Sequence, residues 1–462
     1  MDQFSKYTAL VSENGEHLSY SDLLNFSDIF SEKIGEHCLI FILCSNCIES
    51  AIGYIGCIRR RIVPALLDKS IDITLLRELL ENYHPKFCWV PTFIAGKITG
   101  KRVYSFRNYT LISTKYEQDY QLYHELGLLL ATSGSTGSPK FVRQSYQNIQ
   151  SNTESIIKYL KIVQNDRAIS TMPMNYTYGL SILNTHLATG ASEILTEATL
   201  MDKRFWKQLR EEKATTFGGV PYIYEMLKKL RFNKMELPNL RYVTQAGGKL
   251  SAELCSEFSK LCEDRHMEFI VMYGQTEATA RMAWLPFQYA QEKVGSIGIA
   301  IPGGRFSLID ADNNEIINPN IAGELLYYGD NVSLGYAQNR FDLSLGDDNH
   351  GVLHTGDIAK RDEDGFYYII GRKKRFLKIF GNRVNLDEVE RLLKKEGIEC
   401  ACTGIDDCLK IFITDPSLKE KAGTYIDNHT AISHGGFKVI VIEKIPRNPS
   451  GKVLYSEIKN YD

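Results

Sequence analysis

The chain has 462 residues, of which 44% are hydrophobic and 24% are charged. These values are typical of a globular protein with two or three domains. The 54 lysine and arginine residues nearly balance the 56 aspartate and glutamate residues, so no long-range field attracts nucleic acid or an anionic membrane surface.

The first residues, the apolar runs and the cysteines also argue against several classes of protein. The first residues lack the shape of a secretory signal, and apolar runs such as 38–44 are too short to span a bilayer. Ten cysteines are scattered along the chain, and the pair Cys44 and Cys47 has no second pair at ligand spacing. We expect a cytoplasmic protein with reduced core thiols; zinc or redox chemistry at this pair is the alternative.

Short apolar strands alternate with amphipathic helices over most of the first 370 residues. This alternation predicts βαβ units, a parallel sheet and an α/β fold class. We expect strands at 39–43, 62–67, 87–90, 168–171, 215–218, 241–244 and 269–272, and helices at 47–59, 73–81, 222–229 and 252–262.

The pattern changes from about residue 294. Turn signals separate short β-rich runs, which predict a β-subdomain attached to the α/β body: 305–309, 323–328 and 365–370. We expect the basic run at 371–375 to connect this part of the chain to the residues that follow. The residues beyond it have β–α–β character and predict a small α+β domain, with strands at 376–380, 410–413 and 438–442 and a helix at 386–396.

The most informative stretch follows the apolar run 126–131. It concentrates hydroxyl and glycine residues ahead of Lys140. These residues are Thr132, Ser133, Gly134, Ser135, Thr136 and Gly137. Glycines let backbone N–H groups turn toward an anion, hydroxyls add donors and the lysine adds charge, so this stretch predicts a phosphate-binding loop. A flexible linker is the alternative. A P-loop is excluded because Pro139 and Phe141 flank the lysine.

Further motifs follow in a fixed order: 272–277 (MYGQTE), 323–325 (GEL), 335–336 (GY), 353–357 (LHTGD), 371–372 (GR), 378–383 (KIFGNR), 386–390 (LDEVE) and 445–452 (IPRNPSGK). Together with the hydroxyl-rich loop, this set resembles the adenylate-forming superfamily, which comprises acyl- and aryl-CoA synthetases, peptide-synthetase adenylation domains and luciferases. The resemblance runs from about residue 20 to the C-terminus.

The resemblance implies a large N-terminal domain at 1–372, a hinge at 373–374 and a mobile C-terminal lid at 375–462. It also implies two reactions. ATP and a carboxylate first give an acyl-adenylate and pyrophosphate, with Mg²⁺ as the metal. The acyl group then passes to the thiol of CoA or of a carrier-protein phosphopantetheine. Because the chain stops ten residues after Lys452, we expect any carrier protein to be a separate molecule.

The first reaction joins two anionic groups, so the protein must neutralise charge and hold the reactants in line. Glu277 supplies a carboxylate suited to Mg²⁺. The resemblance implies further nucleotide contacts, with Thr276 on the α-phosphate, Tyr273 beside adenine, Gly247 at the adenine strip, and Asp357 and Arg372 on the ribose.

The resemblance also implies roles in the C-terminal part. Lys452 would swing in with the lid and bridge the carboxylate and the α-phosphate. Gly381 would line the thiol tunnel in the other lid orientation, and Lys374 lies where the hinge residue falls.

The acyl pocket is expected around Asn175, Tyr176, Thr177 and Gly248. Amino-acid-activating relatives place an aspartate where Thr177 stands, and a buried ammonium without that carboxylate is costly. Asn175 and Tyr176 instead resemble the pair found in aryl-acid ligases. We therefore expect an aryl or short acyl acid.

Two departures accompany these matches. Phe141 replaces the glycine that usually follows the loop lysine, and Tyr146 stands where histidine is common. They leave open a specialised acceptor or a weakened second step. Two alternatives also remain: an amino-acid-adenylating ligase that loads a carrier protein, and a degenerate nucleotide-binding homologue without turnover. The retained charged residues of the motifs favour an active enzyme.

Overall fold

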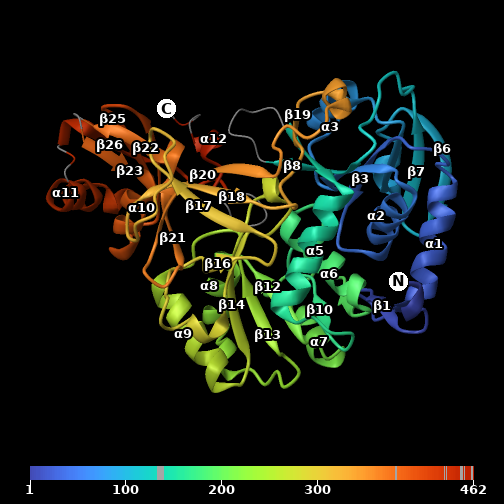
Figure 1. Cartoon of the computed structure of the whole chain (residues 1–462), viewed down its shortest axis with the longest axis horizontal. Helices are drawn as coiled ribbons and strands as arrows, with labels where there is room; N and C mark the ends of the chain where they lie inside the picture. Colours follow the sequence, from blue (N-terminus) through green and yellow to red (C-terminus); the bar gives the residue numbers. More distant parts are fainter. Residues whose placement is uncertain are drawn as a thin grey trace. The chain divides into compact units, whose positions relative to one another are not determined.

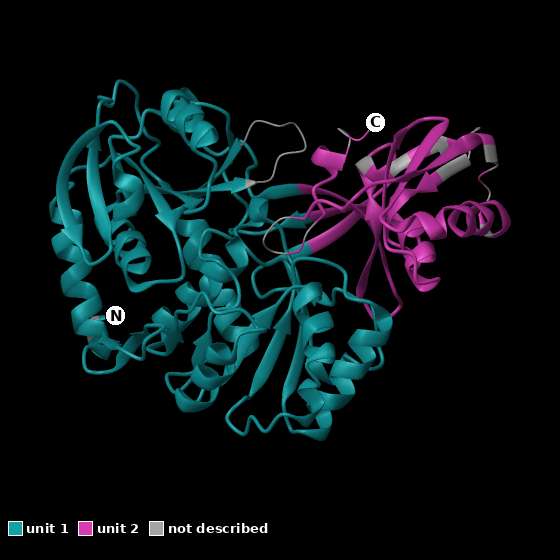
Figure 2. Ribbon diagram, turned by 180° about the vertical axis from the view of Figure 1, so that it is seen from behind, with its two compact units in different colours: residues 1–133, 139–305, 327–353 teal, residues 134–138, 306–326, 354–462 magenta. Residues whose placement is uncertain are grey.

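The computed structural model describes residues 1–132, 140–379, 382–430, 432, 434–447, 451, 453–458 and 461. The chain divides into two compact units (Figure 2): unit 1 comprises 1–133, 139–305 and 327–353, and unit 2 comprises 134–138, 306–326 and 354–462. Unit 2 thus includes 354–372, which the sequence analysis assigned to the N-terminal domain. The functional boundary at 373–374 stays a prediction.

The first sheet of unit 1 has eight strands in the order β19-β9-β8-β4-β3-β5-β7-β6. Its central strands β8, β4, β3 and β5 are parallel, and the outer strands are antiparallel. The bounds are β3 Leu39–Cys44, β4 Val63–Asp68, β5 Phe87–Pro91, β6 Gly100–Phe106, β7 Tyr109–Thr114, β8 Leu126–Thr132, β9 Lys140–Ser145 and β19 Gly335–Ala337.

Helices cover both faces of this sheet. Alternate residues of β3 enter two different clusters: Ile40 and Ile42 pack with residues of α1 (Tyr20–Glu32) and α2 (Ile48–Arg60), whereas Phe41 packs with residues of α3 (Ile73–Tyr83) and α4 (Thr92–Ala95). Because neither face meets water, β3 is a continuous apolar run rather than an alternating one.

The second sheet of unit 1 has nine strands in the order β16-β15-β14-β13-β12-β10-β11-β1-β2. The strands from β14 to β1 are parallel. The bounds are β1 Thr8–Val11, β2 His17–Ser19, β10 Arg167–Ile169, β11 Ser192–Ile194, β12 Thr216–Gly219, β13 Tyr242–Gln245, β14 Glu268–Tyr273, β15 Ala283–Leu285 and β16 Ile299–Ala300, with helices α7 Lys203–Glu211, α8 Pro221–Lys229 and α9 Ala252–Asp264.

Two helices lie between the sheets (Figure 1): α5 (Tyr146–Leu160) packs on β8 and β9, and α6 (Thr177–Thr189) packs on β10 and β11. The first begins with a capping box, in which Ser145 and Asn148 satisfy each other's backbone N–H groups. The α5–α6 pair therefore links the end of the predicted phosphate loop to the predicted acyl pocket.

Unit 2 contains a four-stranded sheet in the order β17-β18-β20-β21, the pair β22-β23 and a three-stranded sheet β24-β25-β26. Helices α10 and α11 share a hydrophobic cluster with the last sheet. The bounds are β17 Arg305–Ile309, β18 Gly323–Tyr328, β20 Val352–Arg361, β21 Tyr367–Arg372, β22 Phe376–Ile379, β23 Asn382–Asn385, α10 Leu386–Lys395, β24 Cys400–Ile405, β25 Cys408–Ile413, α11 Lys419–His429, β26 Phe437–Val441 and α12 Tyr455–Ile458.

The predicted fold class is confirmed, and the structure adds elements that the periodicity did not show. They include helices α1, α5 and α7, the antiparallel hairpin β6–β7, and the antiparallel return of β9 along β8. Phe141, the departure after the loop lysine, is fully buried with its ring 4.8 Å from that of Tyr83. The core thus uses a position that glycine usually holds.

All ten cysteines are unpaired thiols. Cys44 is buried, and burial raises the pKa of its thiol well above the usual range. Cys47 accepts a hydrogen bond from Ser45, 3.3 Å away. Within the described ranges, no helix combines the length and apolar character needed to cross a membrane.

Glu193 gives the fold a pH-dependent cost. It lies on β11 between β1 and β10, it is 3% exposed, and its Oε2 atom has no hydrogen-bond partner among the described residues. Burial raises its pKa from the ordinary 4.5 to about 8. Since the folded pKa is the higher one, this carboxyl favours folding most below pH 4.5, and that contribution is lost as the pH rises toward 8.

We predict that Glu193→Gln removes this loss. The free energy of unfolding of the variant, relative to wild type, should rise by a few kcal/mol between pH 4.5 and 8, at about 1.4 kcal/mol per pH unit. Urea denaturation of both proteins across this range measures the difference. Parallel pH profiles would contradict an uncompensated carboxyl at this position.

Candidate active site

The flanks of the predicted phosphate loop form an antiparallel ladder. Thr132 is the last residue of β8, Lys140 is the first residue of β9, and the two are register partners. The loop residues Ser133, Gly134, Ser135, Thr136 and Gly137 lie outside the described residues. Both ends of the loop are therefore anchored in the first sheet of unit 1.

Lys140 and Glu277 meet at one tyrosine. The Lys140 Nζ atom lies 3.4 Å from the centroid of the Tyr336 ring, and the Tyr336 hydroxyl donates to Glu277 Oε1 at 2.6 Å. Burial, reinforced by the Glu277 carboxylate, raises the pKa of Tyr336, so its hydroxyl stays protonated and donating. The structure thus brings together two predicted site residues through Tyr336, which the motif at 335–336 contained without an assigned role.

The backbone around Glu277 is fixed from two sides. Gln144 of β9 donates through Nε2 to the Thr276 carbonyl at 3.1 Å. The Ser333 N–H donates to the Glu277 carbonyl at 2.9 Å. The short 3₁₀ helix Thr276–Ala278, which carries both predicted residues, is therefore tied to the strand that starts with Lys140.

Glu277 suits the metal that the motifs imply. An ionised carboxylate has about four acceptor positions, and one hydrogen bond from Tyr336 leaves others for a cation. The described residues contain no group of three His, Cys, Asp or Glu side chains that could enclose a metal. A single protein carboxylate fits Mg²⁺, which keeps several waters and takes its other ligands from substrate phosphates.

A buried arginine holds this part of the site. The fully buried Arg143 guanidinium donates to the carbonyls of Leu334 and Tyr336 at 2.9 and 3.0 Å, and it pairs with the Asp348 carboxylate. It thereby fixes β19 against β9. No strand was predicted at 140–145, so no sequence pattern pointed to this role.

The turn after Glu277 is strained. Thr279 has a φ of 63°, an uncommon conformation for a β-branched residue. Its hydroxyl donates to the Asn331 carbonyl at 2.7 Å, and its own carbonyl accepts from the Thr177 hydroxyl. Thr177, predicted to face the substrate, is buried in the first turn of α6. Its hydroxyl is already used in the hydrogen bond to the Thr279 carbonyl.

The adenine strip and the acyl-pocket residues lie next to each other. Gly247 has a φ of +82°, and a Cβ there would stand 2.7 Å from the Tyr176 hydroxyl, so only glycine fits. The Gly248 carbonyl accepts from Gln245 Nε2 at 2.8 Å. Asn175 presents a buried Oδ1 atom without a hydrogen-bond partner among the described residues.

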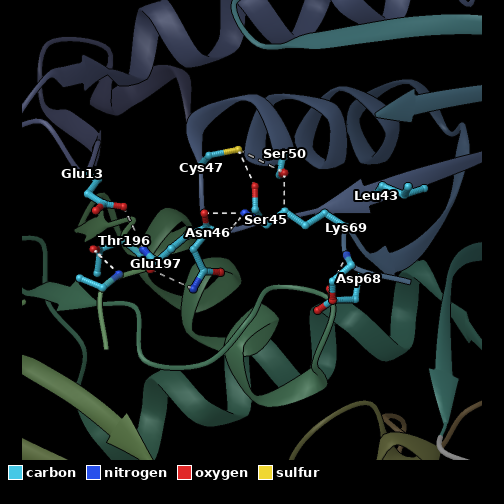
Figure 3. Close-up of polar contacts among 12 residues, drawn as sticks. Glu13, Leu43, Ser45, Asn46, Cys47, Ser50, Asp68, Lys69, Thr196 and Glu197 are labelled. Atoms are coloured by element: carbon cyan, nitrogen blue, oxygen red, sulfur yellow. Dashed lines mark hydrogen bonds and ion pairs between the residues drawn. The ribbon is translucent and has the colours of Figure 1, made fainter. Parts of the chain in front are cut away.

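Asn46, which the sequence analysis did not select, positions the segment before Asn175. Its Oδ1 accepts from the Met174 N–H at 3.1 Å, and its Nδ2 donates to the carbonyls of Met172 and Thr196 at 3.2 and 3.3 Å. Figure 3 shows Asn46 beside Thr196. A polar residue two positions after the buried strand β3 was the available sequence signal.

Tyr273, predicted to flank adenine, ends β14 and pairs with Ala283 of β15. Its hydroxyl accepts from Gln275 Nε2 at 3.3 Å. The ring therefore stands at the carboxyl end of a parallel strand, where ligands of open α/β sheets usually bind.

In unit 2, Asp357 and Arg372 are register partners on β20 and β21, and Arg372 Nε lies 3.1 Å from Asp357 Oδ1. The carboxylate is 4% exposed, whereas the arginine side chain is 57% exposed. The two side chains thus lie together and offer an acceptor and a donor that suit a diol, and their role on the ribose stays a prediction. Lys374 lies in the 3₁₀ helix Lys373–Arg375, and Gly381 and Lys452 lie outside the described residues.

The sequence matches the family model of AMP-binding enzymes over residues 1–337. It is 24% identical to the 2-succinylbenzoate–CoA ligase of Oceanobacillus iheyensis, over 96% of this chain and 95% of that protein. It is 27% identical to the oxalate–CoA ligase of Arabidopsis thaliana, over 71% of this chain and 65% of that protein.

The fold also matches solved structures. One of them, O-succinylbenzoate coenzyme A synthetase from Bacillus subtilis in complex with AMP, superposes with a TM-score of 0.80 at 20% identity, over 99% of this chain and 97% of that one. The chain belongs to the AMP-binding enzyme family. It is an AMP-forming acid–thiol ligase, with ATP and Mg²⁺ as cofactors.

We predict that Tyr336→Phe raises the Mg²⁺ concentration for half-maximal adenylation about tenfold or more. The variant loses the partner that orients the Glu277 carboxylate, and removal of such an outer hydrogen bond to a metal ligand typically lowers metal affinity about 10–100-fold. Pyrophosphate release at varied Mg²⁺ measures the shift. Tyr7→Phe, an exposed tyrosine of the same unit, should leave it unchanged. Equal Mg²⁺ dependence in both variants would remove Tyr336 from the site.

Proposed function

We propose that this protein activates a small aryl or short acyl carboxylic acid with ATP and transfers the acyl group to CoA. The observation that carries the proposal is the cluster of Lys140, Tyr336 and Glu277 at the base of the hydroxyl-rich loop. It combines a cation for phosphates, a carboxylate for Mg²⁺ and a tyrosine that holds the two at fixed positions.

In the first reaction, the chain must bring a carboxylate to a polyphosphate of the same sign. Lys140 and the loop N–H groups would neutralise the β- and γ-phosphates, and Thr276 would donate to the α-phosphate. Mg²⁺ bound at Glu277 would withdraw charge from the phosphate oxygens. Because Gln144 and Ser333 fix the backbone of this turn, these groups need little reorganisation when charge develops.

The nucleoside contacts follow the same logic. Tyr273 and Gly247 offer a flat ring and an open backbone for adenine. Asp357 offers carboxylate oxygens to the ribose hydroxyls, and the Arg372 guanidinium, already beside that carboxylate, adds donors.

The acyl pocket supports an acid without an α-ammonium. The Thr177 hydroxyl is occupied by the Thr279 carbonyl, and Thr177 provides no carboxylate for an ammonium. The unpartnered Asn175 Oδ1 would take a hydrogen bond from the substrate or its bound water. Relatives named for succinylbenzoate, oxalate and ferulate support a small carboxylic acid.

We further propose that residues 375–462 act as the lid, with Lys374 at the hinge. Lys452 would serve adenylation and Gly381 would line the thiol tunnel. CoA is preferred as acceptor because the named relatives are CoA ligases. A free-standing carrier protein remains the second acceptor to test, and the cytoplasmic location stays a prediction.

Exchange of labelled pyrophosphate into ATP tests the first reaction directly. We predict acid-dependent exchange with one or more benzoates or short acyl acids, and no exchange with α-amino acids. Amino-acid-dependent exchange would favour the amino-acid-adenylating ligase. No exchange with any acid, in a protein that still binds ATP, would favour the non-catalytic homologue. Addition of CoA or of a phosphopantetheinyl carrier then identifies the acceptor by thioester formation.

A matched pair of lid variants separates the two reactions. Lys452→Ala should lower adenylate formation about 100-fold or more, the scale for loss of one essential electrostatic group, and should spare thioester formation from supplied adenylate. Gly381→Leu should do the reverse, because its side chain would block the thiol path. Rapid-quench assays of each half-reaction provide the measurement. If each variant slowed both half-reactions equally, the lid assignment would be wrong.

A further inference from the structure

The segment that contains Lys452 is closed at its base by backbone contacts. Arg447 and Val453 are antiparallel bridge partners, and Arg447 Nη1 donates to the Gly451 carbonyl at 2.9 Å. Of the residues 448–452 enclosed by this bridge, the structure describes Gly451 alone. The backbone on either side of the lysine proposed for adenylation is therefore held within unit 2.

The side chain at the start of this segment provides only a weak hold. Arg447 Nη2 donates to Glu399 Oε1 at 2.8 Å, but the two side chains are 41% and 61% exposed. Ion pairs with that exposure contribute little, because water and salt screen the charges. A firmer anchor lies three residues after Lys452.

This anchor is Tyr455, the first residue of α12. Its hydroxyl donates to Glu390 Oε2 at 2.9 Å, and the Arg375 guanidinium carbon lies 4.0 Å from the centroid of its ring. Burial, reinforced by the Glu390 carboxylate, raises the pKa of Tyr455, so the hydroxyl stays protonated and donating. One contact fixes the face of the ring and the other fixes the hydroxyl.

The partners of Tyr455 are themselves held firmly. Glu390 Oε1 accepts from Arg375 Nη2 and from the Cys402 N–H, both at 2.6 Å. Arg375 also pairs with Asp387 at 2.5 Å and donates to the Cys402 carbonyl at 3.0 Å. Because the Arg375 and Glu390 side chains are only 13% and 19% exposed, their ion pair is little screened and costly to break. Tyr455 therefore meets an acceptor that cannot easily move.

Arg375, Glu390 and Tyr455 join three parts of the proposed lid. Arg375 directly follows Lys374, the proposed hinge residue, whereas Glu390 lies on α10 and Tyr455 lies near the end of the chain. The start of the lid and the segment that contains Lys452 thus belong to one packed body.

We propose that Tyr455 is a positioning residue for Lys452 in adenylation. Tyr455 stands three residues after the lysine, so a shift of its ring is passed along a short backbone to the ammonium group. A misplacement of about 1 Å can lower the rate of an enzyme reaction about 100-fold. This inference rests on the proposed function, because it requires that Lys452 acts in adenylation and not in transfer to the thiol.

The first test is Tyr455→Phe, which keeps the ring beside Arg375 and removes the hydrogen bond to Glu390. The substrate is the benzoate or short acyl acid that is most active in pyrophosphate exchange. We expect kcat for adenylation to fall about tenfold or more, with KM for ATP unchanged. Thioester formation from the synthetic adenylate of the same acid should keep the wild-type rate. Tyr461→Phe, an exposed tyrosine near the same end of the chain, is the control and should change neither rate.

The same substitution in a Lys452→Ala background separates positioning from stability. A residue that acts through Lys452 loses its effect once the lysine is gone, so the double variant should adenylate within about twofold of Lys452→Ala. A general weakening of the lid would instead lower the rate by the same factor in both backgrounds.

Each outcome bears on the inference. The positioning role of Tyr455 is overturned, although the ligase function stands, if Tyr455→Phe adenylates normally, slows both half-reactions equally, or has the same effect with and without Lys452. If Lys452→Ala alone adenylates normally, the lid assignment falls together with this inference. If the wild type adenylates no acid, the proposed function falls as well. Thioester formation reports the folded fraction of each preparation, so the ratio of the two rates decides even if a variant is partly unfolded.

Discussion

The buried Arg143 guanidinium is the interaction on which the rest of the nucleotide side depends. It donates to the backbone carbonyls of Leu334, which precedes β19, and of Tyr336, which lies in β19. The Asp348 carboxylate balances its charge. Losing one partner of such a buried pair typically costs about 3–5 kcal/mol, because the other charge is stranded. Since Tyr336 lies on β19, the arginine also determines where its ring stands. The positions of Lys140 and Glu277 therefore depend on a residue that touches no substrate.

A second constraint links the phosphate side to the acyl side. The strained Thr279 receives the hydrogen bond from Thr177 at the start of α6 and gives one to Asn331. The same turn starts with Glu277. A short stretch of backbone thus joins the carboxylate proposed for Mg²⁺ to the start of the helix that follows Asn175 and Tyr176. Acid specificity and catalysis are consequently difficult to change independently in this protein.

The sequence predicted those features that depend on local pattern. Continuous apolar runs such as β3 predicted buried parallel strands. The hydroxyl-rich loop after the apolar run 126–131 predicted a phosphate site, which stays a prediction. Asp357 and Arg372 belong to two separate motifs. Only the resemblance to the family indicated that the two residues would lie together. Arg143 escaped notice because no local spacing indicates its role. Its significance lies in the backbone carbonyls and the carboxylate that it contacts, and these come together only in three dimensions. The return of β9 along β8 was missed because a short apolar run has the same period on either kind of strand.

The β8–β9 ladder has a consequence for how this gene can change. Along β9, Lys140 and the buried Phe141 project to opposite sides of the sheet. A shift of one residue between the two strands would drive the ammonium into the aromatic core and expel the phenyl ring. Burial of Phe141 therefore fixes the position of Lys140 on the strand. Insertions and deletions that shift this pairing are eliminated as folding defects before catalysis is ever tested, whereas those that spare it are selected only by their effect on phosphate binding.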